Sequence, residues 1–349
     1  MQPKVKRPKL NQMHQDTAAT RQQVHTDRAM QIEKLRQKLN RYKQRDWQNE
    51  MIMKKLVDSL SPGHPDDKYE RVANIRSGGF GSVFRANVLG SKESVAIKTI
   101  PVSRSGRNVI HRNSMLLKEL LILQKFRHPN ITAYKDSYLL RDELWIVMEL
   151  VDSHALDVIA RTCDMTTPVM AAVCKGILEA LRFLHGGCVI HRDIKGQNVL
   201  VSKNGEVKVA DFGLSTKEGT DITPEAGTIF FMAPEVVKGN SYSCSCDIWS
   251  MGMTLVQMIT GEEPYCGKGR KSDVLDLIVN NHLPVIGRPI DPDVNDFLHK
   301  CLTYDPKVRA TASQLLQHCF LSSRACSTTV GQHVRMVTFL NSIRGSNAH

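Results

Sequence analysis

One stretch of the chain limits its possible folds more than any other, the segment HRDIKGQN at residues 191–198. It places a carboxylate, an ammonium group and an amide close together on Asp193, Lys195 and Asn198. A second carboxylate, Asp211, opens the segment DFG 18 residues after Asp193. Carboxylate and amide oxygens suit a hard divalent cation, and an ammonium group beside them can offset the charge of a phosphate. The pattern therefore predicts a fold that brings both segments together around a phosphate and a metal ion.

Two earlier segments supply the rest of a nucleotide site. Residues 75–83 read IRSGGFGSV, a glycine-rich loop whose backbone N–H groups can approach phosphates because bulky side chains are missing. Residues 95–98 read VAIK, an apolar strand that would aim Lys98 at the phosphates. Glu119 lies on a predicted helix from which it could form an ion pair with Lys98. Each short segment could serve an ordinary structural purpose, so the inference rests on their joint order and spacing.

The order of these four segments resembles the protein-kinase signature, and the match covers about residues 69–320. Further landmarks are MAPE at residues 232–235 and DIWSMG at residues 247–252. The resemblance implies a structural ion pair between Glu235 and Arg309. It also implies an α+β, bilobal protein-kinase fold, in which a small β-rich lobe precedes a larger helical lobe.

The hydrophobic periodicity agrees with that division. Strand-like apolar runs come first, and helical periodicity dominates from residue 167 onward. We expect the small lobe at about residues 69–150 and the large lobe at about residues 151–320. A basic N-terminal extension, residues 1–68, and a C-terminal tail, residues 321–349, would flank the kinase domain.

The N-terminal extension carries most of the net charge. Residues 1–60 hold 14 Lys and Arg against 6 Asp and Glu, which is +8 of the formal +12. We expect residues 1–16 to be disordered because they are polar and contain proline. An interrupted apolar stripe predicts a helix from about residue 17 to residue 60, before the breaker SPGHP. This helix could dock on the domain or mediate weak self-association.

The basic arm also bears on partners and location. Residues 4–9, KVKRPK, resemble a nuclear-import signal, which would add an import receptor as a partner and allow a cytoplasmic or nuclear location. Nucleic-acid binding is disfavoured because the arm lacks interleaved aromatic residues before Tyr42 and Trp47. No apolar run approaches 18 residues, which argues against a membrane-spanning segment. Nine cysteines without paired spacing are interpreted as reduced.

Three segments narrow the resemblance further. Lys195, and Thr228 in GTIFFMAPE, are typical of serine/threonine kinases, and HRDIKGQN, ELWIVMEL and GT-x-x-x-MAPE are most similar to the PAK-type branch of the Ste group. The resemblance implies transfer of the ATP γ-phosphoryl group to serine or threonine hydroxyls of protein substrates. It implies ATP and Mg²⁺ as cofactors, with Mn²⁺ as an alternative metal. The implied catalytic residues are Asp193, Lys195, Lys98, Glu119 and Thr228. The implied metal ligands are Asn198 and Asp211.

The same resemblance implies how ATP is bound. The adenine ring would lie between the side chains of Val83, Ala96 and Leu200, and backbone groups of Glu149 and Val151 would bond its edge. Apolar walls of this kind also pack the core between two lobes. The other implied nucleotide-binding residues are Ile75, Gly78, Gly79, Phe80, Gly81, Ser82, Lys98 and the gatekeeper Met148.

The chain departs from the family pattern in its glycine-rich loop and its N-terminal extension. Arg76 stands where the G-x-G-x-x-G pattern has its first glycine, while Gly78 and Gly81 keep the second and third positions. PAK-type kinases also carry a segment that binds small GTPases, and residues 1–68 contain no recognisable counterpart. Control by a small GTPase through that route is therefore not expected.

The activation segment departs as well. Pro224 stands where many relatives carry the activation threonine, and Thr223 is displaced by one residue. Arg192 of HRD nevertheless calls for an anion, because an unpaired guanidinium near the site would be costly. We expect phosphorylated Thr223, or an unmodified acid such as Glu225 or Asp221, to take that place.

A pseudokinase is the alternative function, a kinase-shaped scaffold that acts by binding, because a fold does not guarantee chemistry. Every acidic, basic and amide group that the chemistry requires is present, which favours an enzyme. Arg76 is the one local feature that points the other way.

Overall fold

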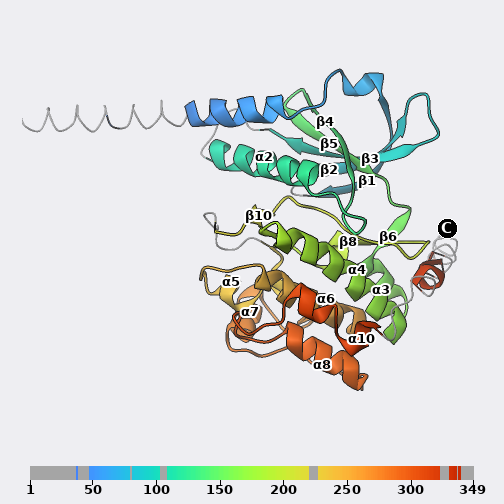
Figure 1. The fold of residues 1–349 in the computed structure, drawn as a ribbon, viewed down its shortest axis with the longest axis vertical. Helices are drawn as coiled ribbons and strands as arrows, with labels where there is room; N and C mark the ends of the chain where they lie inside the picture. Colours follow the sequence, from blue (N-terminus) through green and yellow to red (C-terminus); the bar gives the residue numbers. More distant parts are fainter. Residues whose placement is uncertain are drawn as a thin grey trace, which may run out of the picture.

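The computed structural model describes the chain at residue 37 and at residues 47–78, 81–102, 108–219, 227–322, 330–335 and 337–338. These residues form two lobes, with the sheet and α2 in the upper lobe and most helices in the lower one (Figure 1). The predicted bilobal architecture, a β-rich lobe followed by a helical lobe, is confirmed.

The small lobe is built on an antiparallel sheet with the strand order β1-β2-β3-β5-β4. Side chains alternate between its two faces. Val95 and Ile97 pack in an apolar cluster on one face, so Ala96 and Lys98 point to the other. Lys98 lies opposite Ile146 in the register. The strands are β1 (Tyr69–Gly78), β2 (Gly81–Val88), β3 (Ser94–Pro101), β4 (Tyr134–Leu140) and β5 (Glu143–Glu149).

Helix α2 (Val109–Lys125) is the principal helix of the small lobe (Figure 1). Leu116, Leu120 and Leu123 recur at helical spacing and are buried in the same apolar cluster as Ile146. Glu119 is also buried on this helix, although it is an acid. Packing of the apolar stripe therefore carries an acidic side chain toward the sheet.

A second helix, residues 47–58, lies beside α2. Leu56 is fully buried in the apolar cluster that includes the α2 leucines, and Met53 packs against that cluster. The amide nitrogen of Asn113 donates to Asn49 Oδ1 at 2.9 Å. Of the two alternatives for the N-terminal helix, the structure shows docking on the domain for this portion. Of the earlier part of the predicted helix, only residue 37 is among the described residues.

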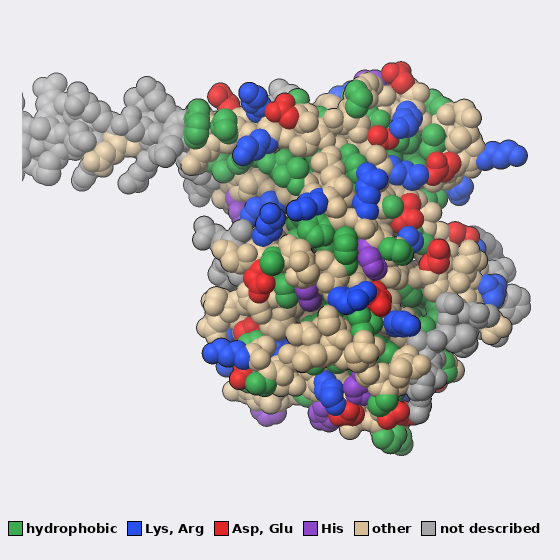
Figure 2. Space-filling model, viewed as in Figure 1, with side chains coloured by type: hydrophobic (Ala, Val, Ile, Leu, Met, Phe, Trp, Pro, Cys, Tyr) green, Lys and Arg blue, Asp and Glu red, His purple; other side chains and the backbone are tan. Residues whose placement is uncertain are grey.

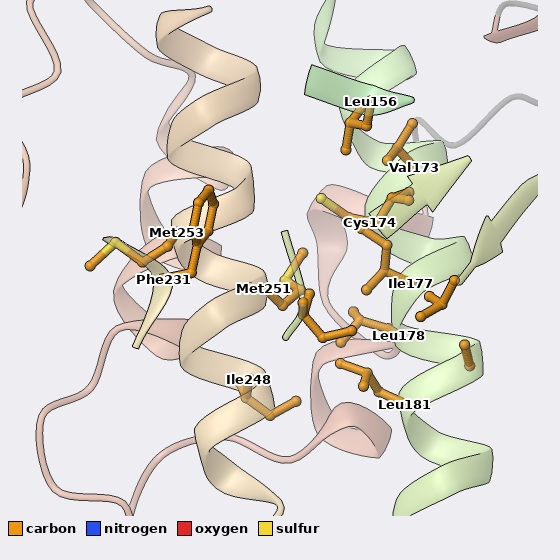
Figure 3. Close-up of a cluster of buried hydrophobic side chains, with 14 of the residues drawn as sticks. Leu156, Val173, Cys174, Ile177, Leu178, Leu181, Phe231, Ile248, Met251 and Met253 are labelled. Atoms are coloured by element: carbon orange, nitrogen blue, oxygen red, sulfur yellow. The ribbon is translucent and has the colours of Figure 1, made fainter. Parts of the chain in front are cut away.

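Two long helices form the centre of the large lobe, α4 (Thr167–Gly186) and α6 (Ser245–Thr260). Ile177, Leu178 and Leu181 of α4 face Ile248 and Met251 of α6 (Figure 3). Nearly every residue of α6 is buried, as expected of a helix that is apolar on all sides. The catalytic segment contacts this core, because Asp247 of α6 accepts from the backbone N–H groups of His191 and Arg192.

The remaining elements are short and connect or cover these helices. They are η1 (Pro65–Asp67), β6 (Ser153–Ala155), α3 (Leu156–Thr162), β7 (Val189–Ile190), η2 (Gly196–Asn198), β8 (Val199–Ser202), β9 (Val207–Val209), β10 (Thr216–Lys217), η3 (Ile229–Phe231), α5 (Pro234–Val237), α7 (Lys271–Val279), α8 (Pro292–Cys301), α9 (Ala312–Leu315) and α10 (Cys319–Ser322). Small sheets join β7 to β10 and β6 to β8 and β9.

The end of the chain also contacts the domain. Val330 and Val334 are buried, and Arg335 donates to the carbonyl of Lys203 at 2.7 Å.

On the face shown in Figure 2, Lys and Arg side chains gather near the boundary between the lobes. No helix among the described residues is long and apolar enough to cross a membrane. The cysteines of these residues are free thiols.

Candidate active site

Lys98 lies between two carboxylates. Its Nζ is 2.7 Å from Glu119 Oε1 and 2.8 Å from Asp211 Oδ1. The predicted Lys98–Glu119 ion pair is thus present. Burial disfavours the charge on Lys98, but the two carboxylates outweigh it and raise the pKa of Lys98. Burial likewise opposes the charge on Asp211, yet the ammonium group holds the pKa of Asp211 below its ordinary value.

Asp193 is held by three side chains. Lys195 Nζ lies 2.8 Å from Asp193 Oδ2, and the amide nitrogen of Asn198 donates to the same oxygen at 2.8 Å. The hydroxyl of Thr228 donates to Asp193 Oδ1 at 2.8 Å. Lys195 also donates to the Thr228 hydroxyl at 2.6 Å. The four residues form one network, which fixes the orientation of the Asp193 carboxylate at the edge of the large lobe.

The position of this network depends on Asp247, a residue whose role the sequence alone did not reveal. Its carboxylate accepts from the backbone N–H of His191 at 2.9 Å and of Arg192 at 2.8 Å, and it contacts His185 at 2.9 Å. Burial would raise the pKa of Asp247, but the contact with His185 and the other donors lower it. The acid at the start of the DIWSMG landmark was the available signal, because an acid that begins an apolar helix must find buried partners.

Backbone strain accompanies the same residues. Arg192 has a φ of 69° and Asp211 a φ of 66°, the left-handed region that side chains other than glycine rarely adopt. Such conformations persist only where surrounding contacts hold them, and they cluster at functional sites. Here the Asp247 carboxylate holds Arg192, and Lys98 holds Asp211.

The predicted nucleotide walls come from both lobes. Val83 lies on β2 and Ala96 on β3 opposite Met148, and Leu200 lies on β8. Gly81 has a φ of 124°, and a Cβ there would approach the Thr99 carbonyl oxygen to 2.1 Å, so only glycine fits. Gly79 and Phe80 lie outside the described residues.

The hinge residue Glu149 is fixed by two contacts. Its Oε1 accepts from the backbone N–H of Ala133 at 2.7 Å and lies 2.9 Å from Lys208 Nζ. The backbone N–H of Glu149 donates to the Ala133 carbonyl at 2.9 Å, and the Val151 carbonyl accepts from the Ser153 hydroxyl at 3.1 Å. Residues 149–151 connect β5 to β6, where the adenine contacts were predicted.

Two oxygens suit a divalent cation at this site. The amide nitrogen of Asn198 is committed to Asp193, which leaves its Oδ1 as the oxygen that could bind a metal. Asp211 supplies a carboxylate of low pKa. The described residues contain no group of three or more His, Cys, Asp or Glu that could hold a metal. The donor set therefore fits an ion that shares its coordination with phosphate oxygens and water.

The predicted structural pair of Glu235 and Arg309 is present and bidentate, with N–O distances of 2.7 and 3.0 Å. Both side chains are buried. The pair joins α5 to the loop that follows α8.

The HRD arginine has neutral partners. Arg192 donates to the carbonyl of Leu214 and, at 3.1 Å, to the hydroxyl of Tyr242. The residues predicted to supply an anion, Thr223 and its neighbours between 220 and 226, lie outside the described residues.

Comparison with known proteins identifies the family. Residues 69–321 match the model described as "Protein kinase domain". The chain is 39% identical over 283 residues to serine/threonine-protein kinase PAK 1 of Mus musculus, covering 78% of the chain and 50% of the relative. It is 36% identical over 274 residues to pak-1 of Caenorhabditis elegans, covering 77% and 47%, respectively. It is 33% identical over 307 residues to STE20 of Saccharomyces cerevisiae, covering 86% and 32%, respectively.

The chain thus spans about half or less of the length of these curated relatives. The region that matches the family model contains the residues of the catalytic network and of the Lys98 ion pairs described above. On this match and on its two-lobed structure, the chain belongs to the protein kinase domain family and is similar to its PAK and STE20 serine/threonine members.

Proposed function

We propose that this chain is an active serine/threonine protein kinase that transfers the γ-phosphoryl group of ATP to protein hydroxyls. The observation that carries the proposal is the network of Asp193, Lys195 and Thr228 together with the Lys98–Glu119 pair. A scaffold without chemistry has no need to keep both sets of contacts in place. The family as a whole uses ATP and a divalent metal.

Each residue has a distinct role in the proposed reaction. The substrate hydroxyl oxygen forms a bond to the γ-phosphorus as the bond from that phosphorus to ADP breaks, and Asp193 accepts the hydroxyl proton. Lys195 neutralises charge on the phosphoryl group as it moves. Lys98, oriented by Glu119, holds the α- and β-phosphates. Thr228 bonds both Asp193 and Lys195, and so fixes their separation.

Asn198 and Asp211 would hold the metal, for which we propose Mg²⁺ with Mn²⁺ as a substitute. A bound divalent ion would offset the negative charge of the phosphates. Oxygen ligands from an amide and a carboxylate, with no nitrogen or sulfur donor, favour these hard ions over zinc.

The experiment measures transfer of labelled phosphate from ATP to one basic and one acidic acceptor protein. We expect Asp193→Asn to lower kcat by about 10²–10⁴-fold, because it removes the proton acceptor. Asp211→Asn should abolish transfer. Equal labelling by the unmodified chain and by Asp211→Asn would overturn the enzyme and favour the pseudokinase.

We also propose that residues 4–9, with four Lys and Arg among six residues, direct nuclear import. Residues 1–12 fused to a fluorescent reporter test this proposal directly. A reporter that stays in the cytoplasm would count against it.

A further inference from the structure

Arg76 connects the two lobes across the mouth of the site. It occupies the position of the first glycine of the glycine-rich pattern and lies on β1 opposite Val83. Its Nη2 donates to Gln197 Oε1 at 3.2 Å. Beside it, the hydroxyls of Ser77 on β1 and Ser82 on β2 are 3.1 Å apart. The guanidinium is therefore presented from an ordered strand end.

Gln197 lies at the centre of the catalytic segment. It is the middle residue of the turn η2, directly before Asn198, which bonds Asp193. The turn is fixed from below, where the backbone N–H of Gly196 donates to Gln257 Oε1 at 3.2 Å. A peptide that delivers a hydroxyl to Asp193 must pass this turn. Its flanking side chains then come within reach of Arg76.

The positive charge of Arg76 has no acidic counterpart there. Gln197 is a neutral amide, and no ion pair joins Arg76 to a carboxylate within the described residues. Asp157 borders Gly196, but it is buried and its Oδ2 bonds Arg161 at 2.6 Å.

The carboxylates on the hinge side are also already paired. Glu149 lies 2.9 Å from Lys208, and Asp152 lies 3.1 Å from Lys203. The Arg76 guanidinium would thus repel a basic residue of a substrate. An acidic residue could form an ion pair with it.

On the proposed kinase function we build a further step: we propose that Arg76 forms an anion-selecting subsite, which favours substrates with a carboxylate or phosphate beside the acceptor serine or threonine. The anion replaces the Gln197 amide as the partner of Arg76 and forms a charge-assisted hydrogen bond that is stronger than the neutral contact. The reaction at Asp193 is unchanged. Only the choice of peptide is affected.

The test compares serine peptides that carry glutamate, phosphoserine, glutamine or arginine at one flanking position at a time. We expect kcat/KM of the unmodified full chain to favour the best-placed anion over glutamine by about 3- to 10-fold, a range typical of one partly exposed charge pair. The Arg76→Gln substitution should abolish this ratio. The glutamate and phosphoserine series separate a carboxylate from a phosphate as the preferred anion.

Arg85→Gln is the matched control. Arg85 is exposed on β2 of the same sheet, where it bonds Ser94 at 3.3 Å, so its loss changes the net charge equally. This variant should keep the ratio. A ratio that survives Arg76→Gln, or that is lost equally in both variants, would overturn the subsite. So would a change in KM for ATP alone, which would instead indicate a contact with the nucleotide.

The outcomes separate this proposal from the proposed function. If the unmodified chain phosphorylates no peptide and no acceptor protein, the kinase assignment fails. Fluorescence anisotropy with the same labelled peptides then measures the subsite by binding alone. Equal affinity for the glutamate and glutamine peptides would reject the subsite.

Discussion

The docked helix at residues 47–58 predicts that a residue far from Asp193 in sequence supports the active site. Leu56 is fully buried against the cluster that contains the α2 leucines, and truncation to alanine should cost about 2–5 kcal/mol of unfolding free energy. For a domain of this size a loss of about 3 kcal/mol lowers the unfolding midpoint by about 6–12 °C.

The same substitution should weaken the Lys98–Glu119 pair. Residues 47–61 contact α2 at both of its ends, through Asn49 with Asn113 at 2.9 Å and through the Ser59 carbonyl with Gln124 at 2.7 Å. Loss of packing between these contacts frees the helix that carries Glu119. We therefore expect kcat/KM for ATP to fall at temperatures where the protein is still folded.

Val57→Ala is the control, because Val57 is the next residue on the same helix and is 51% exposed. It should change the unfolding free energy by less than about 0.5 kcal/mol. The assays are thermal unfolding and phosphoryl transfer at 25 °C for both variants. Equal midpoints for Leu56→Ala and Val57→Ala, or a destabilised Leu56→Ala with unchanged ATP kinetics, would refute the reasoning.

Three further predictions concern the large lobe. Arg309→Met leaves the Glu235 carboxylate buried without its cation and should cost about 3–5 kcal/mol in urea unfolding, and a loss below 1 kcal/mol would contradict it. Burial lowers the pKa of His191 below its ordinary 6.5, so the stabilising contribution of the neutral side chain is complete above pH 6.5 and is lost as the pH falls. The unfolding midpoint should therefore drop between pH 7 and pH 5. In the His191→Asn variant the midpoint should drop less over the same range. If phosphorylated Thr223 supplies the anion expected at Arg192, Thr223→Ala should lose activity and mass spectrometry should find phosphate in residues 215–228; full activity without phosphate there would contradict the phosphoswitch.

The sequence predicted contacts whose residues belong to short motifs. Lys98 and Glu119 could be paired in advance because the VAIK strand and the predicted helix that carries Glu119 follow each other at a characteristic spacing, and the structure joins them at 2.7 Å. Glu235 and Arg309 were paired because the resemblance to protein kinases implies this ion pair. In both cases a recognised pattern linked residues that are far apart in the sequence.

Other contacts could not be predicted, because they depend on packing between distant elements. Asp247 stood in a recognised motif, yet nothing in its spacing indicated that it binds the backbone of His191 and Arg192. Arg76 appeared only as a departure from a glycine pattern, and its contact with Gln197 joins residues 121 positions apart. For the N-terminal helix the apolar stripe left docking and self-association open, because periodicity specifies a buried face but not what buries it.

The catalytic residues differ in how strongly the surrounding structure fixes their positions. The catalytic segment is anchored through Asp247 to α6, which lies in the most buried part of the large lobe. Lys98 is anchored by β3, which pairs with a strand on each side. Glu119 depends on α2, whose contacts with the sheet are side-chain packing and whose outer side is covered by residues 47–58. Loss of packing by residues 47–58 should therefore weaken nucleotide binding, through Glu119, before it impairs proton transfer at Asp193. As Leu56→Ala is warmed toward its unfolding midpoint, KM for ATP should rise before kcat falls.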